Sequence, residues 1–440
     1  MNLFECPFSL HARKRPKAIA LLSSEEEWTY ATCEALISGI AAKLKELGVK
    51  SGDVVALLPT KLFPTPLLFF ALFRLGAIAC PLNIYHPLES LPKSLDDLGA
   101  SLILYPDALT LPKLKQIALP FSKCIRKGKS AGQTFLDKKA LATYLFTSGT
   151  TASPKIACHT LSNHYYSALG SNAYMPLHEG DRYFLSLPLY HIAGIAILFR
   201  TFLAGGAVAL DDGAKNITHV SFVPTQLFRL LKQKNRPSYK KILLGGADIP
   251  YSLYMEAIHA GLPVCPSYGM TEMSSQIATH FSSSSFSLGH PLPYRDIKIG
   301  NEGEILVKGK TLFQGYLQKD GTLALPLDEE GFFATKDLGS YCPKRGLFVR
   351  GRKDRLFISG GENIQPEEIE RHLKNIQGII RAKVVPVPDK EFGHRPKAFI
   401  ESEKDVNEEE LKAYLSSLLP KFKIPTSFVR EKNIHEDPQK

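Results

Sequence analysis

The chain has 440 residues and a formal net charge of +11, with 44% hydrophobic and 22% charged residues. A chain of this length can bury a large core, and we expect it to divide into two or more domains. The positive charge suits anionic partners. The basic residues are spread along the chain, however, which favours small anionic substrates over nucleic acid.

Neither a membrane span nor a secretory signal is expected. The longest apolar run, 66–82, is short and is interrupted by Arg74, so a buried helix followed by a strand is the better interpretation. The first residues lack a basic segment followed by an apolar one. Seven scattered cysteines without a C-x-x-C pair predict reduced thiols in a cytoplasmic protein without a zinc site.

Helical and strand patterns alternate through the first part of the chain. A helix is predicted at 29–48, between a threonine start and a glycine stop. Further strands are predicted at 53–58, 77–81, 101–105, 183–187, 207–210, 219–223 and 241–244, and further helices at 66–76, 192–203 and 225–231. This alternation predicts an α/β fold with layered parallel sheets.

The pattern changes after residue 298. Short strands with glycine turns predict a β-rich subdomain, at 303–309 and around 331–339. A compact pattern follows, with helices at 367–373 and 407–418 and strands at 381–387 and 397–401. We therefore predict a large N-terminal domain, residues 1–353, and a small mobile α+β domain, residues 354–440.

Residues 147–155, which follow the apolar run 141–146, form the most informative segment. Glycine allows backbone N–H groups to approach an anion, the hydroxyls add donors, and Lys155 adds a positive charge. The spacing is not that of a Walker A loop, in which Gly-Lys precedes a serine or threonine. The segment predicts a different phosphate-binding loop, the alternative being a polar turn that ends in a surface lysine.

Four separated segments together resemble the adenylate-forming enzymes, which include acyl- and aryl-CoA synthetases, luciferases and peptide-synthetase adenylation domains. The segments are 147–155, 268–272, 335–337 and 351–370, and they occur in the order typical of that superfamily. Within the superfamily, the resemblance is greatest to the 2-succinylbenzoate–CoA ligases of menaquinone synthesis. It is carried by the short length and by 223–231, 359–368 and 389–396.

The resemblance implies an AMP-forming acid–thiol ligase. The acid would attack the α-phosphate of ATP to form an acyl-adenylate, and the thiol of CoA would then displace AMP. ATP, Mg²⁺ and CoA are implied, with 2-succinylbenzoate as the acid. A homo-oligomer is the expectation from base rates alone. Two alternatives are a general aryl- or medium-chain acyl-CoA synthetase and a nucleotide-binding protein with impaired catalysis.

The resemblance also implies the nucleotide site. The β- and γ-phosphates would be held by Lys155 and by the loop residues Thr147, Ser148, Gly149, Thr150 and Thr151. Adenine would lie against Tyr268 and along the backbone of Gly245, Gly246 and Ala247. Thr271 would contact the α-phosphate, and Glu272 would hold Mg²⁺. The alternative is that Tyr268 is a core aromatic residue and Glu272 a carboxylate at the start of a helix.

Asp337 would accept hydrogen bonds from the ribose, with Arg352 donating nearby, and Asp354 would be the hinge between the two domains. An isolated aspartate such as Asp337 otherwise caps a turn. Gly360 and Gly361 would let the pantetheine arm of CoA pass close to the backbone.

The acyl pocket is expected near residues 187–226. His191 resembles the aromatic gate of the superfamily, and Thr225 and Gln226 would line the pocket. Arg200 lies in an otherwise apolar helical pattern, where a cation needs a partner. It would neutralise the second carboxylate of 2-succinylbenzoate, the alternative being a side chain that extends to the surface.

Two positions depart from the superfamily pattern. Ala152 stands where most members have glycine, which makes the loop stiffer. The adenylation lysine is expected in a glycine-lysine context beyond 419–425, where the candidates are Lys432 and Lys440. Spacing favours Lys440, although Gln439 stands in place of the glycine.

Overall fold

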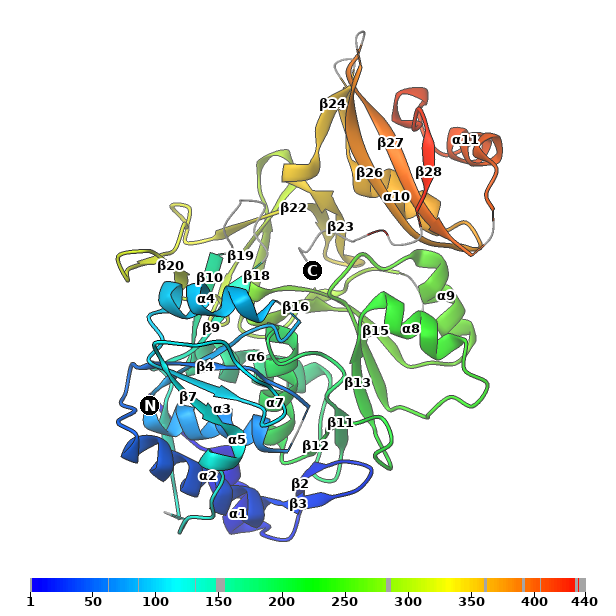
Figure 1. Ribbon diagram of the computed structural model, residues 1–440. Helices are drawn as coiled ribbons and strands as arrows, with labels where there is room; N and C mark the ends of the chain where they lie inside the picture. Colours follow the sequence, from blue (N-terminus) through cyan, green and yellow to red (C-terminus); the bar gives the residue numbers. More distant parts are fainter. Residues whose placement is uncertain are drawn as a thin grey trace.

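The computed structural model describes residues 2–431 and 434, apart from 62, 86, 131, 148–154, 282–285, 360–361, 390–391 and 404. The chain forms a large body of sheets and helices, and a smaller unit built from the last part of the chain stands above it (Figure 1). Two large sheets, a smaller sheet and this last unit account for most of the fold.

The first large sheet has eight strands in the order β21-β20-β10-β9-β5-β4-β6-β7. In that order they are Leu323–Ala324, Gly315–Leu317, Lys155–Thr160, Leu141–Thr147, Ile78–Pro81, Val54–Leu57, Leu102–Tyr105 and Ile117–Pro120. Strands β9, β5, β4, β6 and β7 are parallel, whereas β10 turns back against β9 and pairs with β20 on its other edge. The hairpin β9–β10 therefore joins the parallel part to a segment from much later in the chain.

The second large sheet has nine strands in the order β17-β16-β15-β14-β13-β11-β12-β2-β3. They are His290–Pro291, Ser275–Thr279, Val264–Met270, Lys241–Leu244, His219–Phe222, Arg182–Phe184, Ala207–Ala209, Ile19–Leu22 and Glu27–Thr29. The central strands are parallel, and β15 turns back through a short 3-10 helix, Thr271–Met273, into β16. This turn carries two of the predicted site residues.

Helices pack between and around the two sheets. They are α1 Pro7–Lys14, α2 Tyr30–Glu46, α3 Pro64–Leu75, α4 Leu91–Leu98, α5 Phe121–Cys124, α6 Leu161–Tyr174, α7 Ile192–Ala204, α8 Pro224–Leu231 and α9 Tyr251–His259. The largest apolar core joins residues of both sheets with α2, α3 and α7. Helix α7 ends at Gly205, whose φ of 75° is the left-handed conformation that glycine adopts without strain.

The β-rich part consists of β18 Arg295–Ile299, β19 Glu304–Gly309, β22 Phe333–Cys342 and β23 Gly346–Arg352, which form one antiparallel sheet. Its core is shared with Tyr268, Met273 and Phe313, so this sheet packs against the turn between β15 and β16. A separate two-stranded sheet pairs β1 Leu3–Glu5 with β8 Phe135–Asp137.

The last unit has its own core. It contains β24 Phe357–Ser359, β25 Glu362–Ile364, α10 Pro366–Lys374, β26 Ile379–Asp389, β27 Gly393–Ser402, α11 Glu408–Ser416 and β28 Phe428–Arg430. Its buried apolar residues, among them Ile369, Val384 and Leu411, form a cluster drawn entirely from this segment. The predicted fold class, layered α/β followed by a β-rich part and a small α+β unit, is confirmed.

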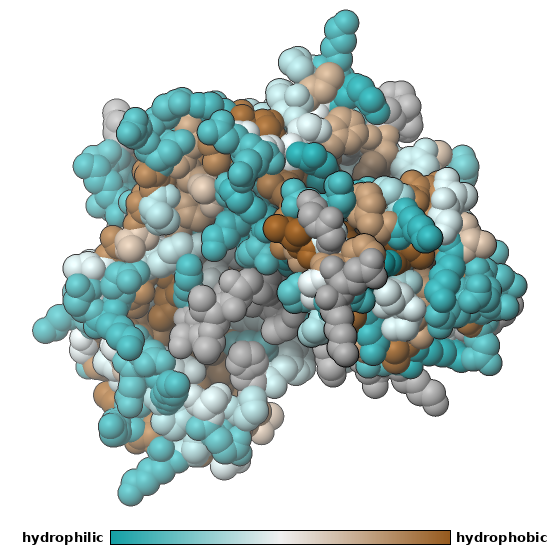
Figure 2. Space-filling model, turned by 90° about the horizontal axis from the view of Figure 1, so that it is seen from above, coloured by the Kyte–Doolittle hydropathy of each residue, from teal (hydrophilic) through white to brown (hydrophobic). Residues whose placement is uncertain are grey.

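Hydrophilic side chains dominate the surface seen from above, and apolar side chains occur there in small groups (Figure 2). Among the described residues, no helix combines the length and the apolar character needed to cross a bilayer. The predicted interruption of the run 66–82 agrees with this finding, because α3 ends at Leu75 and β5 begins at Ile78.

Candidate nucleotide and acyl site

The predicted phosphate loop connects the two strands of the β9–β10 hairpin. Thr147 and Lys155 face each other as the last pair of that hairpin, and the Thr147 hydroxyl donates to the Lys155 carbonyl at 3.3 Å. The ammonium of Lys155 lies 4.9 Å from the ring centre of Tyr316. The other loop residues predicted to contact phosphate, Ser148, Gly149, Thr150 and Thr151, and the irregular Ala152 lie outside the described residues.

The turn at Thr271 and Glu272 is held by groups from two other parts of the chain, β10 and the segment 313–316. His159 on β10 donates from Nε2 to the Thr271 carbonyl at 2.7 Å. The Phe313 N–H donates to the Glu272 carbonyl at 2.7 Å. The Tyr316 hydroxyl donates to Oε1 of Glu272 at 2.6 Å. Both the backbone and the carboxylate of this turn are therefore fixed before any ligand is present.

The environment of Glu272 determines its protonation. Burial raises the pKa of Glu272, and the hydrogen bond from Tyr316 opposes this shift. Burial and the neighbouring carboxylate likewise raise the pKa of Tyr316, so this phenol stays protonated and serves as the donor.

The Glu272 site fits a magnesium ion held mainly by phosphate oxygens. Its carboxylate is only 9% exposed, and a carboxylate has about four lone-pair directions, so a phenol and a cation can both be accommodated. Among the described residues, no three His, Cys, Asp or Glu side chains gather into a metal cluster. Mg²⁺ typically binds through one or two carboxylates together with substrate phosphates, and this donor set matches that pattern.

Tyr268 and Asp337 come from different sheets and meet in a buried contact. The Tyr268 hydroxyl donates to Oδ2 of Asp337 at 2.6 Å. The backbone N–H of Asp337 donates to the Thr335 hydroxyl, and Lys336 between them has a φ of 62°. Burial, reinforced by the Asp337 charge, raises the pKa of Tyr268 well above its usual value. Asp337 is thus not a simple turn cap, and its carboxylate is held at a defined place by a phenol.

Arg352 links this carboxylate to the predicted hinge. One guanidinium nitrogen lies 3.4 Å from Oδ1 of Asp337, and two nitrogens donate to the carboxylate of Asp354 at 3.1 and 2.8 Å. This one guanidinium therefore contacts both Asp337 and Asp354. Burial opposes ionisation of Asp354, but the bonds and charge of Arg352 outweigh it and lower the pKa of Asp354.

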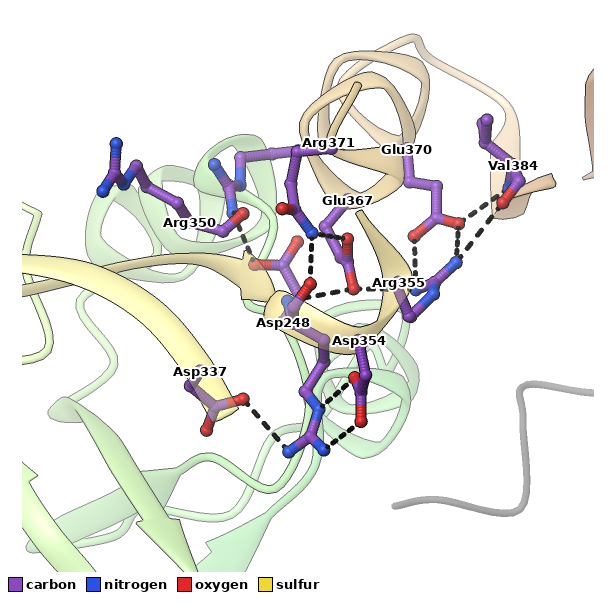
Figure 3. A network of polar contacts seen from close by, with 11 residues as sticks. Asp248, Asp337, Arg350, Asp354, Arg355, Glu367, Glu370, Arg371 and Val384 are labelled. Carbon is purple, nitrogen blue, oxygen red and sulfur yellow. Dashed lines mark hydrogen bonds and ion pairs between the residues drawn. The ribbon is translucent and has the colours of Figure 1, made fainter. Parts of the chain in front are cut away.

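The chain beyond Asp354 is anchored to the first helix of the last unit. Arg355 donates to Glu367 at 3.1 Å and to Glu370 at 2.7 Å, and the backbone N–H of Val384 also donates to Glu370 (Figure 3). Glu367 accepts a further bond from the Arg352 N–H at 3.2 Å. Ion pairs therefore lie on both sides of Asp354. Arg352 pairs with the large body, and Arg355 pairs with the last unit.

The glycine segment after β14 lies beside the Tyr268 strand. A side chain at Gly245 would approach the Ser267 carbonyl to 2.9 Å, and Gly246 has a φ of 79°. Gly245, Gly246 and Ala247 thus form a turn whose backbone lies close to β15, as the adenine interpretation requires.

Arg200, which the sequence predicts on the acyl side, lies on α7. Its side chain is 2% exposed, so the alternative in which it extends to the surface is wrong. It donates to the Ala196 carbonyl at 3.2 Å and to the Tyr183 hydroxyl at 3.3 Å, with its guanidinium 5.7 Å from the Tyr183 ring centre. In the part of the chain that the structure describes, no carboxylate pairs with this cation.

The other predicted acyl residues lie on neighbouring elements. His191 immediately precedes α7 and is exposed, with its ring 4.5 Å from that of Tyr190. Thr225 is half-buried on α8. The Gln226 amide accepts from the Val223 N–H at 3.0 Å and donates to the Ser186 carbonyl at 3.3 Å. Gln226 therefore stabilises the start of α8, and both its amide oxygen and its amide nitrogen have hydrogen-bond partners within the protein.

Three predicted residues, Gly360, Gly361 and Lys440, lie outside the described residues, as does Lys432. Several contacts were missed from the sequence, namely those of His159, Tyr183, Ser221 and Tyr316. Tyr183 shares a hydrogen bond of 2.7 Å with Ser221 and also receives the Arg200 bond. The only available signal was that these polar residues interrupt apolar strand patterns.

Residues 8–317 match the AMP-binding enzyme family. The chain belongs to this family. It is 35% identical to the 2-succinylbenzoate–CoA ligase of Salmonella typhimurium, over 98% of this chain and 94% of that protein. The family assignment confirms the resemblance inferred from the four sequence segments.

Solved structures of relatives agree over the whole length. The o-succinylbenzoate CoA synthetase (MenE) of Bacillus subtilis, in complex with the acyl-adenylate intermediate OSB-AMP, is 30% identical, with a TM-score of 0.91 over 100% of this chain and 97% of that chain. The same enzyme in complex with ATP and magnesium ion has a TM-score of 0.89, at 30% identity over 100% of this chain and 98% of that chain. Both structures therefore match the large body and the last unit of this chain.

Proposed function

We propose that this AMP-binding enzyme is a 2-succinylbenzoate–CoA ligase of menaquinone biosynthesis. It consumes ATP, forms 2-succinylbenzoyl-adenylate with release of pyrophosphate, and transfers the acyl group to CoA with release of AMP. The single observation that carries the substrate assignment is the buried and carboxylate-free Arg200.

The adenylation step needs orientation and charge neutralisation more than covalent help from the protein. Asp337 accepts from the ribose, Tyr268 flanks adenine along Gly245, Gly246 and Ala247, and Thr271 contacts the α-phosphate. Lys155 and the hydroxyls of 147–151 hold the phosphates that leave. Glu272 would hold Mg²⁺, which would supply neutralising charge to the phosphates.

The acyl pocket selects between acids by their charge. A guanidinium buried among apolar side chains is costly unless an anion is paired with it. Among the described residues, Arg200 hydrogen-bonds to one carbonyl and one phenol only, and neither neutralises it. 2-Succinylbenzoate carries two carboxylates and only one is activated, so the other is available to pair with Arg200. A monocarboxylic aryl or fatty acid has no group for this position.

The thioester step requires the last unit to change its position. We place the domain boundary at 353/354, because the core of the last unit is drawn from its own residues and the chain crosses between the units at Asp354. The hinge roles of Asp354 and Arg352 follow from the ion pairs on its two sides. Gly360 and Gly361 pass the pantetheine arm, His191 gates the pocket, and Lys440 is the adenylation lysine.

The deciding experiment is ATP–pyrophosphate exchange with a panel of acids. The panel pairs 2-succinylbenzoate with 4-oxo-4-phenylbutanoate, which lacks the ring carboxylate, and with 2-butanoylbenzoate, which lacks the side-chain carboxylate. We expect rapid exchange with the diacid and slow exchange with both monoacids, and product formation only when CoA is added.

Other outcomes would select the alternatives. Faster exchange with benzoate or a medium-chain fatty acid than with the diacid would indicate a general acyl-CoA synthetase. ATP binding without exchange for any acid would indicate a nucleotide-binding protein that has lost catalysis.

A further inference from the structure

Tyr316 stands between two groups that the nucleotide site uses. It lies on β20, which pairs with β10 in a register that places Tyr316 opposite Ala157, two residues after Lys155 (Figure 1). Its hydroxyl donates to Oε1 of Glu272 at 2.6 Å, while its ring lies 4.9 Å from the Lys155 ammonium. One side chain therefore contacts both the cation and the anion that face the phosphates.

We propose that Tyr316 is a positioning residue for nucleotide binding, which sets the Glu272 carboxylate with its hydroxyl and the Lys155 ammonium with its ring. The inference rests on the proposed function of the site, because it assumes that both charges act on the phosphates of ATP. It assigns to Tyr316 two separable tasks, and each belongs to a different part of the side chain.

The hydroxyl task follows from the surroundings of Glu272. The backbone of this residue is fixed by the Phe313 N–H and by His159, which bonds to the preceding carbonyl. The carboxylate itself is set by Tyr316. Removal of the phenol oxygen would leave a buried carboxylate free to rotate, and hydrogen bonds to a charged group are among the stronger ones in proteins.

The ring task follows from the position of Lys155 at the end of the β9–β10 hairpin. A lysine side chain has many rotamers, and an aromatic face within about 6 Å of its ammonium restricts them. The Tyr316 ring is itself held edge-on by Phe313, with ring centres 4.8 Å apart and planes at 75°. The packing of Phe313 thus fixes the orientation of the Tyr316 ring beside Lys155.

Two substitutions separate the tasks. Tyr316→Phe keeps the ring and removes the hydroxyl, whereas Tyr316→Leu removes both. The matched control is Tyr341→Phe, which removes a phenol oxygen that shares a hydrogen bond of 3.2 Å with the exposed His290; Tyr341 lies on β22, in a different sheet from β20. Thermal unfolding of each full-length variant shows that it is folded.

The measurement is ATP affinity by titration calorimetry, with Mg²⁺ and with EDTA, in the absence of any acid. For Tyr316→Phe we expect the gain in ATP affinity on adding Mg²⁺ to fall by a factor of about ten, with affinity in EDTA unchanged. For Tyr316→Leu we expect an additional loss of about threefold in EDTA, because Lys155 has lost the aromatic ring beside it. Tyr341→Phe should match the unsubstituted protein in both conditions.

An equal loss with and without Mg²⁺ in Tyr316→Phe would overturn the proposal, because it would indicate a general structural role. Unchanged affinity in both conditions would overturn it as well. Neither result depends on the acid, so the assignment of 2-succinylbenzoate is tested independently by the exchange assay. A protein that binds Mg²⁺–ATP as expected but exchanges with no acid would refute the proposed function and leave the role of Tyr316 standing.

Discussion

The nucleotide side and the acyl side of this molecule treat buried charge in opposite ways. Around the nucleotide, Asp337 is bonded to Tyr268 and Arg352, and Glu272 is bonded to Tyr316. On the proposed acyl side, Arg200 is more deeply buried than either carboxylate, but in the described part of the chain it is bonded only to neutral groups. The protein itself completes the polar network that every AMP-forming reaction needs, and leaves incomplete the one that selects the acid.

This difference teaches where specificity arises. A site whose groups are already bonded to one another loses little order when ATP binds, and supplies orientation. A buried cation without an anion favours the ligand that brings one, and rejects ligands that leave it unpaired. Substitutions on the acyl side should therefore change the choice of acid more than substitutions on the nucleotide side do. They should change the free energy of unfolding less.

Arg200→Met should give the largest effect. Removing one partner of a buried charge pair costs about 2–5 kcal/mol of binding, so the KM for 2-succinylbenzoate in the exchange assay should rise by at least about 30-fold. The KM for ATP should stay unchanged. The rate of exchange with 4-oxo-4-phenylbutanoate should not decrease. Because an unpaired buried charge is replaced by an apolar chain of similar length, the free energy of unfolding should hold or increase.

Arg295→Met is the matched control for that variant. Arg295 is also buried, but it donates to the carbonyls of Gln276, Pro293 and Ser167, so its role is to join β18 to β16 and α6. Its loss should lower the free energy of unfolding without a selective loss of the diacid. Equal discrimination between acids in both variants would remove the contrast between the two sides.

Asp337→Asn should give the next largest effect, a loss of affinity for ATP. An amide cannot accept as strongly from both Tyr268 and a ribose, and hydrogen bonds to charged groups contribute about 1.5–3 kcal/mol. We expect the dissociation constant for ATP, measured by calorimetry, to rise by about 10- to 100-fold, with the ratio of rates for diacid and monoacid unchanged. Asp296→Asn, on the exposed side of β18, should alter neither quantity.

The contrast also explains how far the sequence alone could predict this protein. The alternation that predicted β4, α3 and β5 depends on local periodicity, and these elements formed close to the expected positions. The motif residues Tyr268, Asp337 and Arg352 were found because each lies in a recognisable segment. The structure added that they contact one another, which no local pattern contains.

The residues that were missed share one physical reason. Tyr316 acts through the register of β20 against β10, and His159 acts through a carbonyl on a turn far along the chain. Such contacts depend on which strands become neighbours, and an aromatic residue in a strand pattern predicts only burial. Gln226 illustrates the same limit, because the sequence predicts that it lines the pocket but contains no sign of its hydrogen bonds to Val223 and Ser186.

Acid should destabilise both sides by a similar amount. Burial lowers the pKa of His159 on the nucleotide side and of His219 on the acyl side to about 4. For His219 the Asp181 carboxylate opposes this shift, and the charges of Lys240, Lys241 and Arg200 reinforce it. Both rings are neutral in the folded protein at pH 7, whereas histidine in the unfolded chain has a pKa of about 6.5.

The unfolded chain therefore binds more protons between about pH 6.5 and 4, and the stability falls as the pH is lowered through that range. Each histidine contributes a slope of at most about 1.4 kcal/mol per pH unit. Urea midpoints at pH 7, 6 and 5 should show this decline, and His219→Asn should make it shallower. A decline of the same slope in His219→Asn would mean that the pKa of His219 is the same in the folded protein as in the unfolded chain.

Arg371→Ala should give the smallest effect, because it changes a contact that belongs to neither pocket. Arg371 on α10 pairs with Asp248 at 3.4 Å and donates to the carbonyls of Val349 and Arg350, which fastens the last unit to the large body (Figure 3). Pairs at such half-exposed positions contribute about 0.2–1 kcal/mol, so the urea midpoint should shift only slightly.

Arg371→Ala should alter the rate of thioester formation, because the last unit changes its position in that step. We expect the thioester-forming rate to change by less than about fivefold, while adenylation and the choice of acid are retained. Lys412→Ala is the control, because its pair with Glu408 at 2.8 Å lies within α11 and does not cross between the units. If Arg371→Ala altered acid selectivity while Lys412→Ala did not, the acyl side would depend on the position of the last unit, and Arg200 alone would not account for specificity.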